Sequence, residues 1–199
     1  MAFETLRKQL EANGFQVSVF ATAEEAAAYL NQEIDNTTVG CGGSMTLKDM
    51  GLYDSLAAHN TLYYHGVSDD PKSAMQNAMT ADVYLLSANA IAENTGEILS
   101  IDGTGNRVSS TLFGHRKVYF VAGRNKVSPD FDSALWRLRN VVAPKNAQRL
   151  GRKTPCAVKG DKCYNCNSPE RICRGLVVHY KKMGSMDMEV VLVDQELGY

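Results

Sequence analysis

Residues 37–47 have the sequence Thr37-Thr38-Val39-Gly40-Cys41-Gly42-Gly43-Ser44-Met45-Thr46-Leu47, and their pattern indicates the fold class. Its first three residues favour a β-strand, its centre is a cluster of glycines, and a helix is predicted to begin near Leu47. A strand that passes through a glycine-rich turn into a helix is the repeating unit of α/β proteins, in which helices connect parallel strands. The stretch therefore predicts one crossover unit of a mainly parallel sheet.

Strand patterns alternate with helix patterns on both sides of this stretch. Period-two alternation or short apolar runs predict strands at residues 15–20, 62–64, 83–87, 98–101, 117–122 and 189–194. Apolar residues at helical spacing, together with capping residues, predict helices at residues 2–13, 22–31, 47–59, 69–79 and 130–142. This order implies a largely parallel sheet that is covered by helices on both faces.

Residues 151–175 break the alternation and form a basic loop that contains four cysteines. The strand predicted at residues 189–194 follows this loop and is expected to return to the sheet. The chain therefore divides at about residue 150 into an α/β domain, residues 1–150, and a cysteine-bearing segment with the last strand, residues 151–199.

The composition excludes several classes of protein. The 199 residues include 21 Lys+Arg and 22 Asp+Glu, and the net charge of −1 offers no broad positive surface to nucleic acid or to an anionic membrane. The longest apolar patches, such as residues 83–86, are far shorter than the roughly 20 residues that span a bilayer. Residues 1–7 lack the pattern of a signal peptide. We therefore expect a cytoplasmic protein with a small-molecule partner, and the oligomeric state, a homodimer included, stays open.

The glycine cluster is the first candidate binding site. Its backbone N–H groups and two hydroxyl groups lie at a predicted helix N-terminus, an arrangement that suits a phosphate or a carboxylate. The residues of this anion cradle are Gly40, Gly42, Gly43, Ser44 and Thr46. The sequence matches neither the dinucleotide fingerprint nor the P-loop, and the alternative is a tight strand-to-helix turn without a ligand. Cys41 within the cradle could serve as a reactive thiolate, although no base lies beside it in the sequence.

Two further loops follow predicted strands and carry polar groups. Glu93 and Asp102 are candidates for general acid/base catalysis, because proton transfer requires a carboxylate beside the ligand. Arg107 and Lys126 could neutralise a ligand anion, and Asn125 could orient it. The alternatives are a turn of Asp, Asn and Gly for the Asp102 loop and solvated surface positions for the two cations.

Several of these segments resemble the LUD (lactate-utilisation) domain proteins. The matching segments are Gly40-Cys41-Gly42-Gly43-Ser44-Met45-Thr46-Leu47, Thr95-Gly96, Asp102-Gly103-Thr104-Gly105-Asn106-Arg107 and Asn125-Lys126-Val127, in the family's order over about residues 5–150. The resemblance implies a three-layer α/β/α sandwich similar to the fold of glucosamine-phosphate deaminase, ribose phosphate isomerase and CoA-transferases. Relatives in that group bind phosphorylated or acyl small molecules with a glycine-rich loop after a strand. The resemblance therefore adds Thr95, Gly96 and Asn106 to the predicted ligand-binding residues.

The family takes its name from proteins linked to the oxidation of lactate to pyruvate alongside iron–sulfur partner subunits. This chain resembles a short subgroup with a C-terminal cysteine segment, which the lactate-associated members do not generally have. That departure weakens the transfer of lactate oxidation to this chain. The partner protein that the resemblance implies is an iron–sulfur redox protein.

Four of the five cysteines form a second candidate site, with the spacing Cys156-x6-Cys163-x2-Cys166-x6-Cys173. Cys163 and Cys166 could bind one metal from a tight turn, and Cys156 and Cys173 would complete a set of four thiolate ligands. Thiolate-only ligation suits zinc or an iron–sulfur cluster, and the spacing matches neither a standard zinc motif nor a ferredoxin motif. A 4Fe–4S cluster is narrowly favoured over zinc, and the alternatives are free thiols or disulfides formed on handling. The basic residues that would offset the thiolate charge are Lys159, Lys162, Arg171 and Arg174.

Together these sites predict an enzyme of organic-acid or redox metabolism that binds a small phosphorylated or carboxylated metabolite at the glycine-rich loop. The alternative is a non-enzymatic iron–sulfur accessory or electron-transfer subunit of a lactate-oxidation-type complex. A third interpretation is a regulatory module that binds a metabolite without turnover. Nucleic-acid binding is least favoured, because the basic stretch at residues 149–162 is explained by charge compensation around the thiolates.

Overall fold

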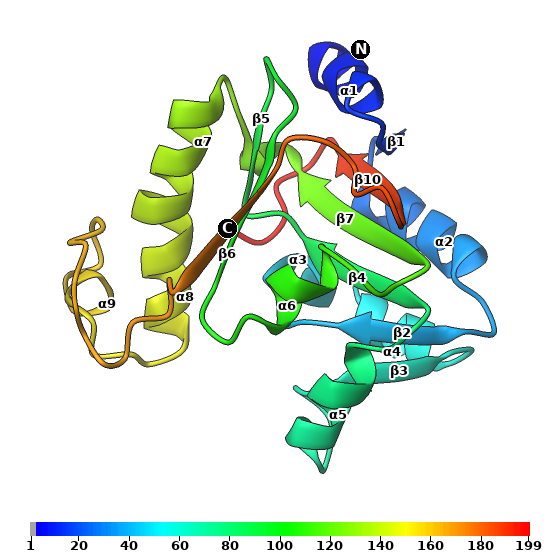
Figure 1. Ribbon diagram of the computed structural model, residues 1–199, viewed down its shortest axis with the longest axis horizontal. Helices are drawn as coiled ribbons and strands as arrows, with labels where there is room; N and C mark the ends of the chain where they lie inside the picture. The colour runs from blue at the N-terminus through cyan, green and yellow to red at the C-terminus, as the bar shows by residue number, and fades with distance from the viewer. Residues whose placement is uncertain (1–2) are drawn as a thin grey trace.

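The computed structural model describes residues 3–199, and their core is a sheet in which all strands run parallel (Figure 1). Within these residues the sheet has six strands, in the order β1-β10-β7-β4-β2-β3. Their bounds are β1 (Gln16–Phe20), β10 (Asp187–Val193), β7 (Lys117–Gly123), β4 (Val83–Ser87), β2 (Thr38–Cys41) and β3 (Thr61–Tyr64). The last strand of the chain, β10, pairs with both β1 and β7 and so lies inside the sheet.

Helices cover both faces of this sheet, as the alternating patterns predict. The helices are α1 (Glu4–Ala12), α2 (Ala23–Glu33), α3 (Met45–Asp49), α4 (Leu52–Ala57), α5 (Pro71–Ala78), α6 (Asn106–Ser110), α7 (Phe131–Arg137), α8 (Ala143–Arg149) and α9 (Pro155–Lys159). On one face α2, α3 and α4 bury apolar side chains against the sheet. On the other face α1 and α5 pack together with a second, smaller sheet. The predicted α/β class and three-layer α/β/α arrangement are confirmed.

The central strand β4 shows why the sequence specifies this architecture. Every residue of Val83-Tyr84-Leu85-Leu86-Ser87 is buried. Val83 and Leu85 point into the core with α2, α3 and α4, whereas Tyr84 and Leu86 point into the core on the opposite face. A strand that is buried on both faces has a continuous apolar sequence, and each such large side chain stabilises the fold by roughly 1.5–3 kcal/mol.

The smaller sheet, which the sequence patterns do not predict, has four strands within the described residues. They are β8 (Val127–Ser128), β5 (Ala90–Ala92), β6 (Ile98–Asp102) and β9 (Gly175–His179), in that order. β6 is antiparallel to both of its neighbours, so the strand predicted at residues 98–101 does not join the main sheet. The physical reason is the short connection after β5, which is long enough for a hairpin and too short for a parallel crossover.

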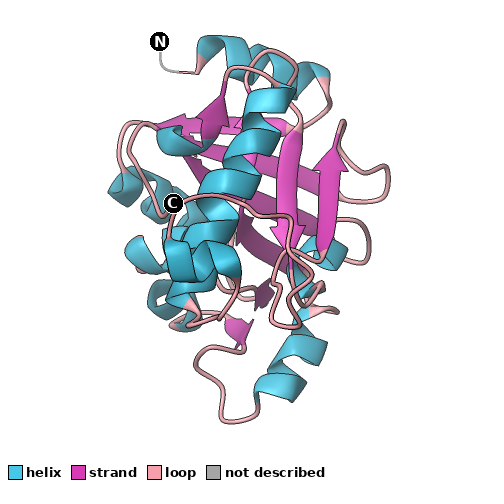
Figure 2. Cartoon of the chain, turned by 90° about the vertical axis from the view of Figure 1, so that its left-hand side faces the viewer, coloured by secondary structure: helices cyan, strands magenta, loops and turns pink. Residues whose placement is uncertain are grey.

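A long helical segment covers the outer face of the smaller sheet (Figure 2). α7 continues through a π-helical turn (Leu138–Val142) into α8, so the helix predicted at residues 130–142 extends to residue 149. Pro144 lies at the start of α8, where its ring would clash with a carbonyl one turn earlier in a regular helix, and a widened turn relieves this clash. Among residues 3–199, no helix has both the length and the apolar character needed to cross a membrane.

Candidate ligand-binding cavity

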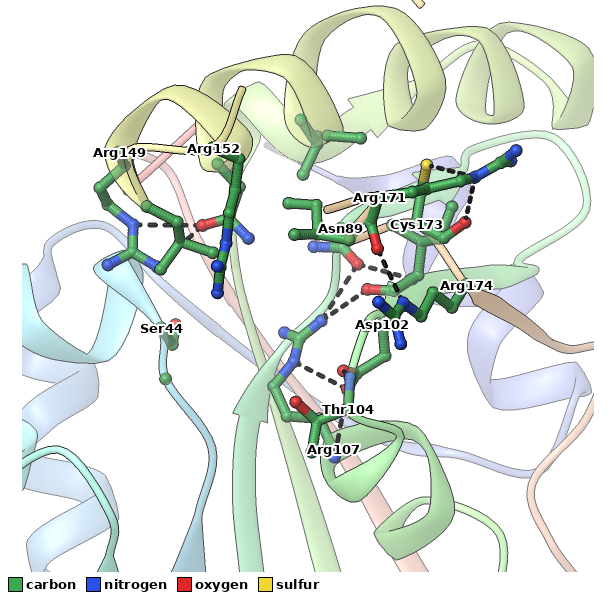
Figure 3. Close-up of a pocket in the computed structure, with 18 of the residues that line it drawn as sticks. Ser44, Asn89, Asp102, Thr104, Arg107, Arg149, Arg152, Arg171, Cys173 and Arg174 are labelled. Carbon is green, nitrogen blue, oxygen red and sulfur yellow. Dashed lines mark hydrogen bonds and ion pairs between the residues drawn. The ribbon is translucent and has the colours of Figure 1, made fainter. Parts of the chain in front are cut away.

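A cavity of about 540 Å³ lies at the edge of the main sheet where the carboxyl ends of β3, β2, β4 and β7 meet (Figure 3). In a parallel sheet the loops that follow neighbouring strands gather at one edge, and α/β proteins bind ligands there. Here these loops contribute Gly43, Ser44, His65, Ser87, Asn89 and Lys126. The other walls come from the loop between β6 and α6, from α8, and from residues 154–174, which we call the cysteine segment.

The glycine-rich loop contributes less to the cavity than the predicted anion cradle implies. Of its five predicted residues, Gly43 and Ser44 line the cavity. The N–H of Ser44 donates to the hydroxyl of Tyr53 at 2.9 Å, and the Ser44 side chain caps α3. Thr46 is buried, and its hydroxyl donates to the main-chain oxygen of Leu197 at 3.3 Å. Other parts of the protein therefore already satisfy hydrogen-bonding groups of this loop, and fewer of its N–H groups remain for an anion.

The two remaining glycines of the cradle are required for packing. A Cβ atom at Gly40 would lie 2.5 Å from the main-chain oxygen of Ala78 and 2.8 Å from the ring of Tyr84. A Cβ atom at Gly42 would collide with the side chain of Arg107. Gly40 thus permits the close approach of β2 and α5, and Gly42 leaves room for Arg107 to reach the cavity.

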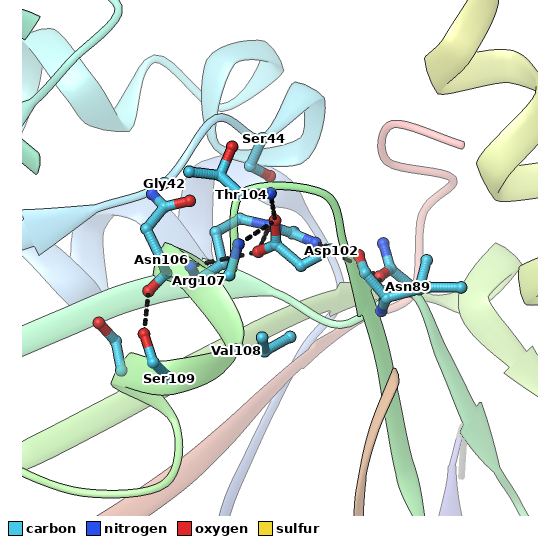
Figure 4. Close-up of polar contacts among 12 residues, drawn as sticks. Gly42, Ser44, Asn89, Asp102, Thr104, Asn106, Arg107, Val108 and Ser109 are labelled. Atoms are coloured by element: carbon cyan, nitrogen blue, oxygen red, sulfur yellow. Dashed lines mark hydrogen bonds and ion pairs between the residues drawn. The ribbon is translucent and has the colours of Figure 1, made fainter. Parts of the chain in front are cut away.

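Asp102 and Arg107 form a polar centre on one wall of the cavity (Figure 4). One carboxylate oxygen of Asp102 accepts hydrogen bonds from the N–H groups of Thr104 and Gly105. The other accepts from the N–H of Arg107 and lies 3.4 Å from its Nε. Burial alone would raise the pKa of Asp102, but the charge of Arg107 and the loop N–H donors hold that pKa below its ordinary value. Asp102 is therefore ionised at neutral pH, and of the two predicted proton-transfer roles only that of a base suits it.

The Arg107 guanidinium is fixed by the end of β6. Its Nη2 donates to the main-chain oxygen of Ile101 at 2.9 Å and lies 3.4 Å from Oδ1 of Asn89. The side chain is only 14% exposed. Its Nη1 has no hydrogen-bond partner among the described residues, so this group remains available to a ligand.

Lys126 is a buried cation in the turn that follows β7. Only 4% of it is exposed, and its Nζ donates to the main-chain oxygen of Tyr199 at 3.2 Å. Burial, with the charges of Arg137 and Arg107, lowers the pKa of this amine to about 7. The charge of Asp49 acts in the opposite direction. The amine is therefore close to half protonated at neutral pH, and an anionic ligand would favour its charged form.

His65 lines the cavity directly after β3, and no sequence motif singles it out. Its Nδ1 is buried and has no hydrogen-bond partner within residues 3–199. Burial lowers the pKa of His65 against the opposing charge of Asp102, so the imidazole is neutral at pH 7. Its position immediately after the strand predicted at residues 62–64 is the signal that could identify it, because neighbouring parallel strands end at a common edge.

Four arginines line the outer part of the cavity, on two sides of it (Figure 3). Arg149 ends α8 and Arg152 follows it, whereas Arg171 and Arg174 belong to the cysteine segment. The sequence assigns the latter two only to charge compensation for thiolates, and it does not predict their place on a cavity wall. No spacing pattern reveals that place, because an irregular loop brings these residues to the cavity.

Three predicted site residues lie away from the cavity, in the turn between β5 and β6. This turn contains Glu93, Thr95 and Gly96, and it lies at the opposite end of β6 from Asp102. The main-chain oxygen of Thr95 accepts a hydrogen bond of 2.8 Å from the side chain of Asn13, beside the end of α1. The structure therefore packs this turn against α1 and does not bring Glu93 to the cavity.

Asn106 and Asn125 occupy different surroundings. Asn106 lines the cavity at the start of α6. Asn125 does not line it; its Oδ1 accepts from the N–H of Leu197 at 3.1 Å and so anchors the residues that follow β10. The predicted catalytic and ligand-binding residues that meet at the cavity are Gly43, Ser44, Asp102, Asn106, Arg107 and Lys126.

The four cysteines predicted to bind a metal are free thiols of intermediate exposure. Cys173 lines the cavity, and its Sγ accepts a hydrogen bond of 3.2 Å from Nε of Arg171. This bond, with the nearby thiols of Cys173, Cys166 and Cys163, raises the pKa of Arg171. Arg171 therefore contacts the sulfur of Cys173 and the main-chain oxygen of Cys166, whereas Cys156 lies in α9.

The donor set suits a soft metal, because four thiols lie within one short segment. The positions of these thiols do not fit a metal ion. Across residues 3–199, no group of three or more His, Cys, Asp or Glu side chains is placed to hold one. The guanidinium of Arg171 lies against Cys173 instead. A metal centre at these cysteines therefore requires residues 156–173 to rearrange.

Cys41, the remaining cysteine, lies in the core with 1% of its surface exposed. Burial raises the pKa of its thiol far above the usual range. Cys41 therefore stays protonated at neutral pH, and the interpretation of this residue as a reactive thiolate is wrong.

The chain is similar to known proteins in its sequence pattern and in its fold. The model of the LUD domain family matches residues 3–193, a range that includes the cysteine segment and β10. A search of curated proteins gives no match. Among solved structures, a DUF162 family protein from Deinococcus radiodurans is similar with a TM-score of 0.52 and 10% sequence identity, over 95% of this chain and 94% of that chain. At this identity the likeness shows the fold alone.

Proposed function

The chain belongs to the LUD domain family, and on that premise we propose that it binds a small phosphorylated or carboxylated metabolite in the cavity at the sheet edge. The observation that carries this proposal is the charge of the cavity wall. The cations that line it are Arg107, Lys126, Arg149, Arg152, Arg171 and Arg174, and the carboxylates are Asp102 and Glu170. One of these carboxylates, Asp102, is already paired with Arg107.

An anion is the ligand that such a wall favours. Burial of a cation costs free energy that a negative partner can offset, and the buried Lys126 forms no ion pair with an Asp or Glu of the described residues. Arginine adds geometric selectivity, because its planar fork matches carboxylate and phosphate groups through two parallel hydrogen bonds.

Three groups beside the ligand suit proton transfer. His65 is a neutral imidazole that can accept a proton, and Lys126, with a pKa of about 7, can accept or donate one near neutral pH. Asp102 is the predicted carboxylate that remains at the cavity. We propose these as the acid/base groups of an enzyme of organic-acid or redox metabolism, the area to which the family name points.

The test is Gly43→Asp, which places a carboxylate among the cations. A Cβ atom at Gly43 has no neighbour closer than Nε2 of His65 at 4.0 Å, so the substitution fits without a clash. Gly184→Asp is the matched control, because a Cβ atom there meets nothing within 4 Å and Gly184 lies outside the cavity. We expect inorganic phosphate and lactate to raise the melting temperature of the wild type and of the control but not of Gly43→Asp. Equal responses of the two variants would contradict the proposal.

A second proposal concerns the cysteine segment, where Cys156, Cys163, Cys166 and Cys173 bind a 4Fe–4S cluster or zinc after rearrangement. The support is the concentration of four of the five cysteines in one segment and the contacts of Arg171 with Cys173 and Cys166. Zinc would fasten a segment that has little core of its own. A cluster would supply electron transfer, and the chain would then be a non-enzymatic accessory or electron-transfer subunit of a lactate-oxidation-type complex.

Metal and acid-labile sulfide analysis of anaerobically purified protein tests this second proposal. Iron with sulfide and a visible absorption band would identify a cluster, whereas a colourless protein with bound zinc would identify a zinc site. The double variant Cys163→Ser, Cys166→Ser should lose the metal, and Cys41→Ala, which changes the remaining cysteine, should keep it. Protein that contains neither metal would overturn the proposal.

A further inference from the structure

We infer that the ligand carries at least two linked phosphoryl groups, as in the diphosphate ester of an organic metabolite, with one group on the inner cations and the next on the outer arginines. This inference rests on the proposed function, because it specifies the ligand of the same cavity. The inner cations are Arg107 and Lys126, and the outer arginines are Arg149, Arg152, Arg171 and Arg174.

The charge of the wall is too large for one phosphoryl group. Counted over side chains, its six cations and two carboxylates leave a formal excess of four positive charges, or three when Lys126 is neutral. A phosphate monoester carries about −1.5 to −2 charges at pH 7. The negative charge of two linked phosphoryl groups approaches the excess positive charge of the wall. One phosphate, or a monocarboxylate such as lactate, leaves much of that charge unneutralised.

The cations lie at two depths. Arg107 is 14% exposed and Lys126 is 4% exposed, so both sit within the protein at the sheet edge. Arg152 and Arg174 are exposed at the outer part of the cavity. Figure 3 shows Arg149 and Arg152 on one side, Arg171 and Arg174 on the other, and Arg107 between and below them. A cavity of about 540 Å³ has room for a ligand that reaches from the inner to the outer cations.

The outer arginines keep hydrogen-bond donors for the second group. Arg149 uses Nε and Nη2 on the side chains of Asn146 and Tyr199, which leaves Nη1. Arg171 uses Nε and Nη1 on the main-chain oxygens of its own loop, which leaves Nη2. The side chain of Arg152 makes no hydrogen bond or ion pair within residues 3–199. These donors suit phosphoryl oxygens, because charge-assisted hydrogen bonds from arginine to phosphate are among the strongest in proteins.

Isothermal titration calorimetry at constant ionic strength tests the inference with inorganic phosphate, diphosphate and citrate as probes. We expect diphosphate to bind roughly tenfold or more tightly than phosphate, and more tightly than the tricarboxylate citrate. Equal affinity for phosphate and diphosphate would overturn the inference and leave the proposed function intact. Tighter binding of citrate would overturn the phosphoryl class, and the absence of binding by every anion would overturn both proposals.

Variants of the exposed outer arginines test where the second group binds. Arg152→Gln and Arg174→Gln should each reduce the affinity for diphosphate towards that for phosphate, with phosphate binding unchanged. Arg116→Gln is the matched control, because Arg116 is exposed, lies outside the cavity and has no side-chain partner within the described residues. An equal loss of phosphate and diphosphate binding in the outer variants, or the same loss in the control, would overturn the division into inner and outer cations.

Discussion

The inner and outer walls of the cavity are built in opposite ways. The inner wall consists of residues at the carboxyl ends of β3, β2, β4 and β7, whose hydrogen-bonded ladders fix their positions, and of Arg107, which reaches it from α6. The outer wall includes the cysteine segment, in which residues 160–174 form neither helix nor strand. The inner wall is therefore set by the topology of the sheet, whereas the outer wall depends on a small number of individual contacts.

The two walls meet at the loop between β6 and α6. The N–H of Arg174 donates to the main-chain oxygen of Asp102 at 2.9 Å. A Cβ atom at Gly103 would lie 2.7 Å from the main-chain oxygen of Ile172, so this glycine allows the cysteine segment to approach. We therefore expect changes in the strands that position the inner wall to alter stability strongly, and changes in the outer wall to alter ligand binding more than folding.

The largest effect is expected from Gly40→Ala in β2, the strand that leads into the inner wall. The added Cβ would lie 2.5 Å from the main-chain oxygen of Ala78, and a backbone atom cannot move aside cheaply. We expect a loss of roughly 1–3 kcal/mol or more in the free energy of unfolding, measured by urea denaturation. Gly184→Ala is the control, because its added Cβ meets nothing within 4 Å. A Gly40→Ala protein as stable as the control would remove the distinction between the two walls.

A smaller effect, on binding and not on folding, is expected at Lys126. Its pKa of about 7 means that the attractive ammonium form dominates below that pH and is lost above it. The affinity for sulfate, whose own charge is constant in this range, should therefore fall by roughly tenfold between about pH 6 and pH 8. Burial is the main cause of this low pKa, and the charges that add to it are those of Arg137 of α7 and Arg107 of α6, opposed by Asp49 of α3.

Two variants separate Lys126 from its titrating neighbour in this experiment. Lys126→Met should bind sulfate weakly with little dependence on pH. His65→Gln should keep the dependence, because the pKa of His65 lies below its ordinary value and the ring is already neutral over most of the range. A pH dependence that persists in Lys126→Met and disappears in His65→Gln would assign the titration to the histidine.

The walls also differ in how far the sequence predicts them. The apolar run of β4 and the glycines after β2 identify a parallel sheet, and the rule that ligands bind beyond strand ends then brings Arg107 and Lys126 to the site. The same rule predicts that His65 lies at the site, because it directly follows β3, although no motif identifies it. Inner-wall residues are predictable to this extent because the strand order places them.

The turns at the two ends of β6 show where this reasoning stops. The turn with Glu93 and the loop with Asp102 have similar compositions, rich in acidic residues, Gly, Asn and Thr. β5 and β6 pair as an antiparallel hairpin, so the two connections lie at opposite ends and only the Asp102 loop reaches the cavity. The arginines of the cysteine segment are still harder to predict, since no periodic pattern determines the path of an irregular loop.

The smallest effect is expected from Cys173→Ser in the outer wall. The sulfur accepts one hydrogen bond from Nε of Arg171, and a serine hydroxyl can accept it as well. Arg171 also stays bonded to the main-chain oxygens of Cys173 and Cys166. In the presence of a chelator and a reductant we expect the free energy of unfolding to change by less than about 0.5 kcal/mol. A loss as large as that of Gly40→Ala under these conditions would show that the outer wall is as tightly determined as the inner one. A large loss that appears only when the chelator is omitted would instead indicate that Cys173 ligates a metal, because removal of one thiolate then costs metal binding as well as a hydrogen bond.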